Sequence, residues 1–216
     1  MTTRIGNISK EFDLERMVDQ LKSNPGYEAD ICYFENYEKN LQSYKNNGNP
    51  SDMKWVMPLF EAGYKDPINR AATHNPGVHF DPDIIYFLDK MLGTYCVQAW
   101  VNRLEPGQFM PLHIDNDKKN HLLEYGELES YSIHIGEPQP GHLFFIENHC
   151  HYMEPNGEIY KWDDRFSLHG GANIGYTTKY ILIYQGLRPK QPFNFTYKWS
   201  DNMTPISIEL ENGNIL

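Results

Sequence analysis

Cysteine is scarce in this chain of 216 residues, which contains only Cys32, Cys96 and Cys150. Three cysteines at wide spacings do not suggest a disulfide framework, so we expect a reducing compartment and a cytoplasmic protein. The first residues, Met1 to Leu14, carry charges and lack the apolar stretch of a signal peptide. The longest apolar run near the C-terminus, Tyr180 to Tyr184, is far too short to span a membrane, so no membrane association is expected.

Runs of basic residues are absent as well. The formal net charge is −10, and Lys118-Lys119 is the only basic doublet. Because an acidic surface repels a phosphate backbone, we expect no binding to duplex nucleic acid. The expected partners are therefore a small-molecule substrate or a peptide or protein substrate, and the sequence carries no signal for the oligomeric state.

Aromatic residues and turn formers are plentiful instead. Aromatics make up 14% of the chain, and 16 glycines and 14 prolines are spread along it. This composition favours strands and lined pockets over a plain helical bundle. The length suits one sizeable domain, and no repeat marks a boundary, so we expect a single domain over residues 1–216.

Two helices are predicted before residue 94. The first has apolar residues at helical spacing and ends at Asn24-Pro25-Gly26. The second opens at Asp81-Pro82, a capping residue followed by proline at the first helical position, and ends at Gly93. Their apolar faces are predicted to comprise Leu14, Met17, Val18 and Leu21 in the first helix, and Ile84, Phe87, Leu88 and Met91 in the second.

Short strands dominate from residue 95 onward. Their regular spacing, with turn residues between them, predicts a mainly β barrel or sandwich with the helices packed on its outside. Asn156-Gly157 is a hairpin signal, and residues 149–151 are interpreted as a connecting loop. The predicted strands cover residues 95–103, 109–114, 130–135, 142–147, 158–162, 177–184 and 206–210.

The residues that indicate chemistry begin with His113 and Asp115. Residues i and i+2 of a strand point to the same face, so this pair can present an imidazole and a carboxylate to one ion. His169 is the best candidate for a third ligand. Two histidines and one carboxylate leave three positions of an iron(II) ion open for other ligands. His113 alone could equally be a surface or core histidine, and the ordered set of turn, strand and later histidine favours the metal site.

This pattern resembles the 2-oxoglutarate and iron(II)-dependent oxygenases, whose H-x-D…H triad lies on a double-stranded β-helix, the jelly-roll fold that cupins share. The run Arg103-Leu-Glu-Pro-Gly, followed by His113-Ile-Asp115, is similar to the aspartyl/asparaginyl β-hydroxylase-like and prolyl-hydroxylase-like branches. The segment from Trp162 to His169 is also similar to the first branch. The resemblance covers about residues 95–187. Residues 1–94 would then be helical support and residues 188–216 a C-terminal extension.

The resemblance implies a basic side chain on the strand after the distal histidine, where it binds the far carboxylate of 2-oxoglutarate. Lys179 occupies that place. Alternation groups Lys179 with Ile181 and Ile183 on an apolar face, where an unpaired lysine is costly and an anionic partner is favoured. The other interpretation is an ordinary lysine on a solvent-facing strand. Most relatives carry arginine here, which binds a carboxylate through two parallel bonds rather than one point charge.

Further cosubstrate contacts are predicted on the strand that contains Tyr131, Ser132 and His134. By resemblance, His134 could contact the near carboxylate of the cosubstrate, and a structural histidine is the alternative. Arg103 either binds a substrate carboxylate or pairs with an acid. Three residues that share one face of the preceding strand either line the pocket or face away from it: Gln98, Trp100 and Asn102.

Two other groups are weaker candidates. His149-Cys150-His151 could bind a soft metal, but no further ligand lies at zinc spacing, so its histidines are interpreted as incidental. Either Asp163 or Asp164 could orient His169 through a hydrogen bond, or both could belong to a charged turn.

The function that these residues predict is an enzyme, an iron(II) and 2-oxoglutarate-dependent dioxygenase. The resemblance implies that it uses O2 to hydroxylate a C–H bond of an amino acid, a peptide or a protein side chain. Two alternatives stay open. One is a cupin-like metalloenzyme or metal-binding β-barrel that does not use 2-oxoglutarate, and the other is a non-catalytic binding module.

Overall fold

Two β-sheets form the centre of the computed structural model, which describes residues 2–23, 73–74, 82–107, 109–113, 120–162, 167–190, 195–199 and 205–210. In chain order the helices and strands are β1 (Thr3–Asn7), α1 (Leu14–Ser23), β2 (Thr73–His74), α4 (Pro82–Leu92), β3 (Tyr95–Leu104), β4 (Phe109–His113), the 3-10 helix η1 (Asn120–Glu124), β5 (Gly126–Ile135), β6 (His142–Ile146), β7 (His149–Tyr152), β8 (Glu158–Trp162), β9 (His169–Asn173), β10 (Lys179–Pro189), β11 (Phe195–Trp199) and β12 (Pro205–Leu210). The last two pair only with each other as a small separate sheet.

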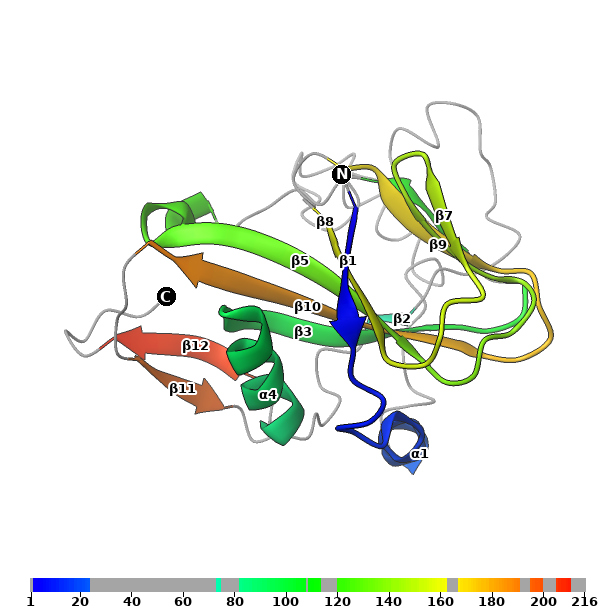
Figure 1. The fold of residues 1–216 in the computed structure, drawn as a ribbon, viewed down its shortest axis with the longest axis horizontal. Coiled ribbons are helices and arrows are strands. Elements are labelled where there is room, and N and C mark those ends of the chain that lie inside the picture. The colour runs from blue at the N-terminus through cyan, green and yellow to red at the C-terminus, as the bar shows by residue number, and fades with distance from the viewer. Residues whose placement is uncertain are drawn as a thin grey trace, which may run out of the picture.

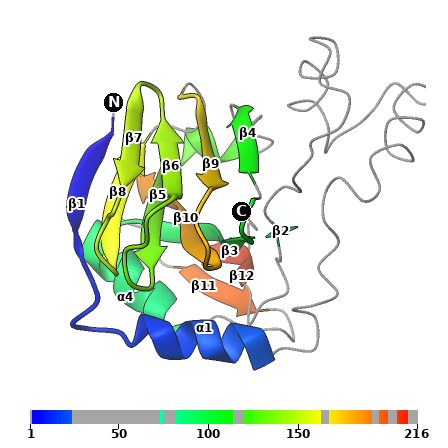
Figure 2. The ribbon, with the colours of Figure 1, turned by 90° about the vertical axis from the view of Figure 1, so that its right-hand side faces the viewer.

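The connectivity of β3 to β10 is that of a double-stranded β-helix, as predicted. The larger sheet has the order β1-β8-β5-β10-β3-β2 and the smaller one β4-β9-β6-β7, with antiparallel pairing throughout. Successive strands cross between the sheets, except for the β6–β7 hairpin, so that strands distant in sequence become neighbours. Figure 2 shows the smaller sheet in front of the larger one.

Both helices cover the outer face of the larger sheet, which confirms that part of the prediction (Figure 1). The buried side chains of α1 and α4 pack against residues of β3, β5, β8 and β10 that point away from the smaller sheet. The predicted apolar face of α4 needs one correction, because Met91 is 39% exposed while Ile85 and Leu92 are buried. The buried face of α4 is therefore rotated relative to the predicted face, by about one residue along the sequence.

A second apolar cluster fills the space between the two sheets. It includes Trp100, Trp162, Ile181 and Ile183 from the larger sheet and Phe144 and Ile146 from the smaller one. Lys179 shares this face of β10, because alternate residues of a strand point to the same side. The predicted grouping of Lys179 with Ile181 and Ile183 is thus confirmed.

Several sequence-based expectations about local structure were wrong or incomplete. Residues 149–151 belong to strand β7 instead of a loop; three of the four β7 side chains are exposed, so apolar alternation gave no signal. The turn at Asn156-Gly157 is present, with φ +79° at the glycine, but it does not form a hairpin. It leads from β7 of the smaller sheet to β8 of the larger one. Strands β1, β9 and β11 were not predicted.

Some expectations concern residues outside the described ranges, among them Asp115, Asp163, Asp164 and Cys32. The two cysteines within those ranges, Cys96 and Cys150, are free thiols. Among the described residues, no helix has both the length and the apolar character needed to cross a membrane.

Candidate functional site

The first feature of the candidate site is the pairing of His113 with His169. His113 is the last residue of β4 and His169 the first of β9, and the two are direct partners in the antiparallel ladder. Side chains of such partners start only about 5 Å apart and lie on the same face of the sheet. The fold therefore brings two predicted ligand positions together. Asp115, two positions beyond the end of β4, and the side chain of His113 are outside the described parts of the structure.

The environment of His169 suits a metal ligand. Its side chain is buried, and its ring lies 5.4 Å from the Trp162 ring. The Nδ1 atom is 3.1 Å from the backbone oxygen of Ser167. A carbonyl oxygen can only accept a hydrogen bond, so Nδ1 carries the proton in this arrangement. The lone pair is then on Nε2, which is the atom that can bind a metal ion.

Among the described side chains, no group of three histidines, cysteines or acids is arranged to hold a metal ion. Of the three predicted ligands, only the side chain of His169 belongs to that set.

The second feature is Lys179, the first residue of β10. It is only 2% exposed, and its Nζ atom donates a hydrogen bond to the backbone oxygen of Leu143 on the opposite sheet. The same atom lies 5.6 Å from the centre of the Phe144 ring. Within the described residues, no carboxylate pairs with this ammonium group. Burial lowers the pKa of Lys179 to about 7. The charge of the nearby Cys150 acts in the opposite direction and raises this pKa.

Lys179 reaches the strand that carries His169. A Cβ atom at Gly171 of β9 would lie 3.5 Å from Nζ, so the ammonium group sits beside this glycine. Gly171 is two residues from His169 on the same face of the strand, a distance of about 6.7 Å. A buried cation and a predicted metal ligand thus lie near positions of β9 that are two residues apart on the same face.

His134 lies in the same interior, near Lys179. It is the register partner of Ile181, and its ring lies 6.2 Å from that of Phe144. Burial, together with the charges of Lys179, His151 and His142, lowers the pKa of His134 to about 3. Its Nε2 atom is buried and has no hydrogen-bond partner among the described residues.

His134 and the candidate metal site lie at different positions along β5. Four residues of β5, about 13 Å of strand, separate it from Ser130. Ser130 is the register partner of Trp162, whose ring contacts His169. His134 therefore lies toward the Lys179 end of the interior, away from the ring of His169.

Ser132 and Tyr131 lie on opposite faces of β5. Ser132 pairs with Ile183 and points into the interior, where its buried hydroxyl has no hydrogen-bond partner among the described residues. Tyr131 pairs with Tyr184 in the core beneath the helices, and its hydroxyl donates to Glu129. The structure thus brings Ser132, but not Tyr131, to the space that contains Lys179.

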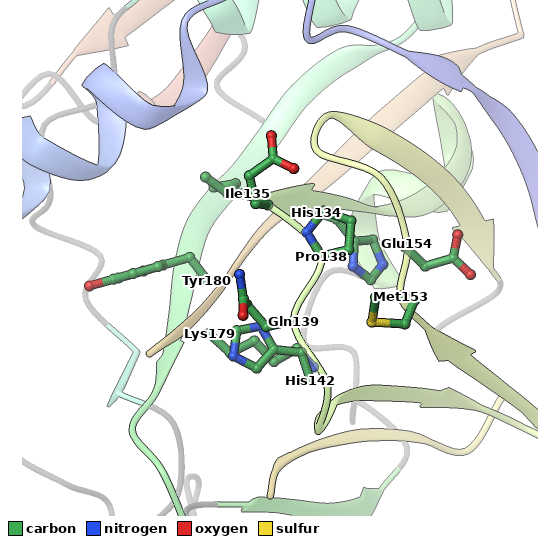
Figure 3. A pocket seen from close by; sticks show the side chains of 11 residues that line it. His134, Ile135, Pro138, Gln139, His142, Met153, Glu154, Lys179 and Tyr180 are labelled. Atoms are coloured by element: carbon green, nitrogen blue, oxygen red, sulfur yellow. The ribbon is translucent and has the colours of Figure 1, made fainter. Parts of the chain in front are cut away.

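A small pocket opens at this end of the interior (Figure 3). Lys179 and His142 lie close together in the view, while Tyr180 points away from them. Only two lining residues, His134 and Lys179, were predicted as site residues; those not predicted include Gln139, His142, Met153 and Glu154. Alternation along β6 groups His142 with Phe144 and could have identified it, whereas Glu154 lies in a turn without a periodic pattern.

Other sequence candidates have structural partners. The Arg103 Nε atom lies 3.4 Å from a carboxylate oxygen of Glu105, in agreement with the ion-pair interpretation. The Trp100 ring nitrogen donates to Asn102, 3.1 Å away, so these two polar groups of β3 satisfy each other. His151, from the presumed loop, is buried between the sheets and lies 3.5 Å from Glu154.

Comparison with known proteins finds structural likeness only, since no family model and no curated protein matches the chain. A 2-oxoglutarate/Fe(II) oxygenase-family protein from Burkholderia pseudomallei is 18% identical, with 50% of this chain and 52% of that one covered and a TM-score of 0.35. A prolyl hydroxylase from Trichoplax adhaerens, solved with a peptide fragment of hypoxia inducible factor, is 14% identical (62% and 74% covered, TM-score 0.41). A cupin-superfamily sugar phosphate isomerase from Silicibacter pomeroyi is 16% identical (60% and 76% covered, TM-score 0.28).

The chain spans about half the length of the Burkholderia protein. Likeness this distant includes both oxygenases and an isomerase, so it does not assign an activity. The functional argument rests on the residues of the candidate site.

Proposed function

We propose that this protein is an iron(II) and 2-oxoglutarate-dependent dioxygenase that hydroxylates a C–H bond of an amino acid, a peptide or a protein side chain. The overall reaction consumes 2-oxoglutarate, O2 and the substrate C–H bond, and it yields succinate, CO2 and the hydroxylated substrate. The observation that carries the proposal is the buried ammonium group of Lys179, which has no carboxylate partner among the described residues and lies beside the strand of His169.

The residues present fit the iron ion and the cosubstrate. The hydrogen bond at Nδ1 of His169 leaves the ring lone pair on Nε2, and His113 is the direct strand partner of His169. Asp115 completes the proposed ligand set. Iron held in this way would supply the activation of O2, which amino acid side chains cannot perform.

Lys179 would provide the charge that binds the far carboxylate of 2-oxoglutarate. The ammonium group is already desolvated, so a carboxylate would replace a hydrogen bond to a neutral carbonyl with a hydrogen bond between opposite charges. His134 Nε2 and Ser132 Oγ are buried atoms that a cosubstrate could satisfy. The apolar side chains between the sheets exclude water from this contact and thereby strengthen it.

The proposal is tested by an anaerobic titration of the metal-free protein with iron(II) and then with 2-oxoglutarate. The chelate of iron with 2-oxoglutarate has a weak visible charge-transfer band, which we expect to appear. Without its imidazole ligand, His169→Ala should lose iron binding. Lys179→Met should keep iron binding and need about a hundredfold more 2-oxoglutarate for the same band.

The matched control is Lys90→Met, which removes an exposed lysine of α4 and should leave both titrations unchanged. A wild-type protein that binds iron without any band would overturn the cosubstrate assignment and leave the cupin-like metalloenzyme as the function. A protein that binds no iron would overturn the metal site itself.

A further inference from the structure

Glu147 has an unusual backbone conformation next to the candidate metal site. It follows β6 in the turn to β7, and its φ of +52° is one that residues other than glycine rarely adopt. Its strand neighbour Ile146 is the register partner of His169. Conformations of this kind are retained where surrounding contacts hold them in place, and they often occur near functional sites.

Two hydrogen bonds connect Glu147 to the segment that precedes β9. Its backbone N–H donates to the carbonyl of Leu168 at 2.6 Å. Its side-chain Oε1 accepts a hydrogen bond from the hydroxyl of Ser167 at 2.9 Å. Ser167 is almost fully buried, with 1% exposure, so its orientation depends on this contact.

Ser167 in turn holds the predicted metal ligand. Its backbone carbonyl accepts the Nδ1 hydrogen bond of His169, 3.1 Å away. The three residues therefore form one chain of contacts from the β6–β7 turn to the imidazole. Hydrogen bonds to a ligating histidine fix its ring orientation and its tautomer, and their loss typically weakens metal binding about 10–100-fold.

We infer that Glu147 is a positioning residue for the metal site, acting through Ser167 on the ring of His169. This inference rests on the proposed function, because it takes His169 as a ligand. The Glu147 carboxylate accepts the hydrogen bond of the Ser167 hydroxyl, and the Glu147 backbone N–H donates to Leu168. The Ser167 carbonyl, which accepts the hydrogen bond from His169 Nδ1, lies between these two contacts.

The test is a titration with cobalt(II), whose visible absorption reports the ligands directly and needs neither 2-oxoglutarate nor turnover. Glu147→Gly removes the carboxylate, so we expect about tenfold weaker cobalt binding. Glycine adopts the left-handed conformation of this position without strain, so we expect an unchanged temperature of thermal unfolding. Ser167→Ala should show the same loss. The double variant should lose little more, because both changes break one chain of contacts.

Two variants serve as controls. Glu147→Gln keeps an oxygen that can accept the Ser167 hydrogen bond and should bind cobalt like the wild type. Glu127→Ala removes an exposed acid of β5 and should have no effect.

The outcomes separate this inference from the proposed function. Wild-type cobalt affinity in Glu147→Gly, together with lost affinity in His169→Ala, would overturn the positioning role alone. An equal loss in Glu147→Gln and Glu147→Gly would also overturn it, because the hydrogen bond would then not be the cause. Unchanged affinity in His169→Ala would overturn the proposed metal site, and the positioning role with it.

Discussion

Lys179 places a positive charge between the two sheets, where no carboxylate of the described residues pairs with it. Its side chain is enclosed between the sheets, and its pKa is lowered from 10.5 to about 7 by burial. A basic group whose folded-state pKa lies below its unfolded value destabilises the fold when it is protonated. The penalty is fully present below about pH 7 and disappears as the pH rises toward the unfolded value.

Replacement of this residue should therefore stabilise the protein. We expect Lys179→Met to raise the free energy of unfolding near neutral pH by an amount on the order of a few kcal/mol, because methionine suits an apolar interior. Urea denaturation at about pH 6.5 and about pH 10 measures the effect, which should shrink at the higher pH. A variant that is less stable than the wild type at both values would contradict the description of Lys179 as an uncompensated buried cation.

The same group should make cosubstrate binding depend on pH. A carboxylate binds the protonated lysine, so affinity for 2-oxoglutarate should be constant below about pH 7 and fall up to tenfold per unit above it. The other groups near Lys179 should contribute little, because burial lowers the pKa of His134, His142 and His151 and raises that of the Cys150 thiol.

Calorimetric titration of the metal-loaded protein with 2-oxoglutarate, under anaerobic conditions and at several pH values, measures this dependence. The slope should be missing in Lys179→Met. A wild-type affinity that rises above pH 7 would contradict the assignment of Lys179 as the anchor.

At the scale of single elements, β9 combines a proposed metal ligand, His169, with a glycine beside Lys179. A side chain at Gly171 would meet the backbone of Leu143 at 3.3 Å and the Lys179 ammonium at 3.5 Å. The branched side chain in Gly171→Val should fill the space proposed for the far carboxylate of 2-oxoglutarate. We expect at least about tenfold weaker 2-oxoglutarate binding with metal affinity unchanged.

Ala172→Val is the matched control for this prediction, because Ala172 follows Gly171 on the same strand and points to the opposite face. The spectroscopic titration with iron(II) and 2-oxoglutarate measures both variants. Equal affinities for 2-oxoglutarate in Gly171→Val and the wild type would place the far carboxylate elsewhere.

The elements also show what the sequence could and could not predict. Strands β3, β6, β8 and β12 were predicted to within a few residues because apolar and β-branched residues mark them. Strand β9 was missed because His169-Gly-Gly-Ala-Asn173 contains no β-branched residue and two glycines. Strand β7 was missed because most of its side chains face solvent.

The candidate site was predictable only in part, for a related reason. The spacing of His113 and Asp115 and the apolar alternation around Lys179 are local patterns that one segment displays. The pairing of His113 with His169, and the contact of Glu147 with Ser167, depend on the register between distant strands. No local pattern encodes that register. Tyr131 and Ser132 were both predicted as cosubstrate contacts, although neighbouring residues of a strand point to opposite faces and the sequence does not tell which face is internal.

At the scale of the whole molecule, the protein has two apolar clusters, one beneath the helices and one between the two sheets. The cluster beneath the helices contains the buried residues of α1 and α4, whereas the cluster between the sheets surrounds the site. Changes in the first cluster should therefore affect stability more than binding. Leu88, fully buried in α4, is a suitable probe.

We expect Leu88→Ala to lower the free energy of unfolding by about 2–5 kcal/mol, because it leaves a cavity beneath the larger sheet. Cobalt affinity of the folded variant should stay at the wild-type value. Urea denaturation and cobalt titration below the unfolding range measure the two quantities. A large loss of cobalt affinity in the folded variant would show that the two clusters are coupled.

The two ends of the proposed cosubstrate contact different sheets. His113 and His169 are neighbours within the smaller sheet, so a metal ion alone would tie together strands that are already hydrogen-bonded. Lys179 belongs to the larger sheet. A molecule bound to the metal at one end and to Lys179 at the other would act as a removable crosslink between the halves of the sandwich, and its consumption in each catalytic cycle would release them.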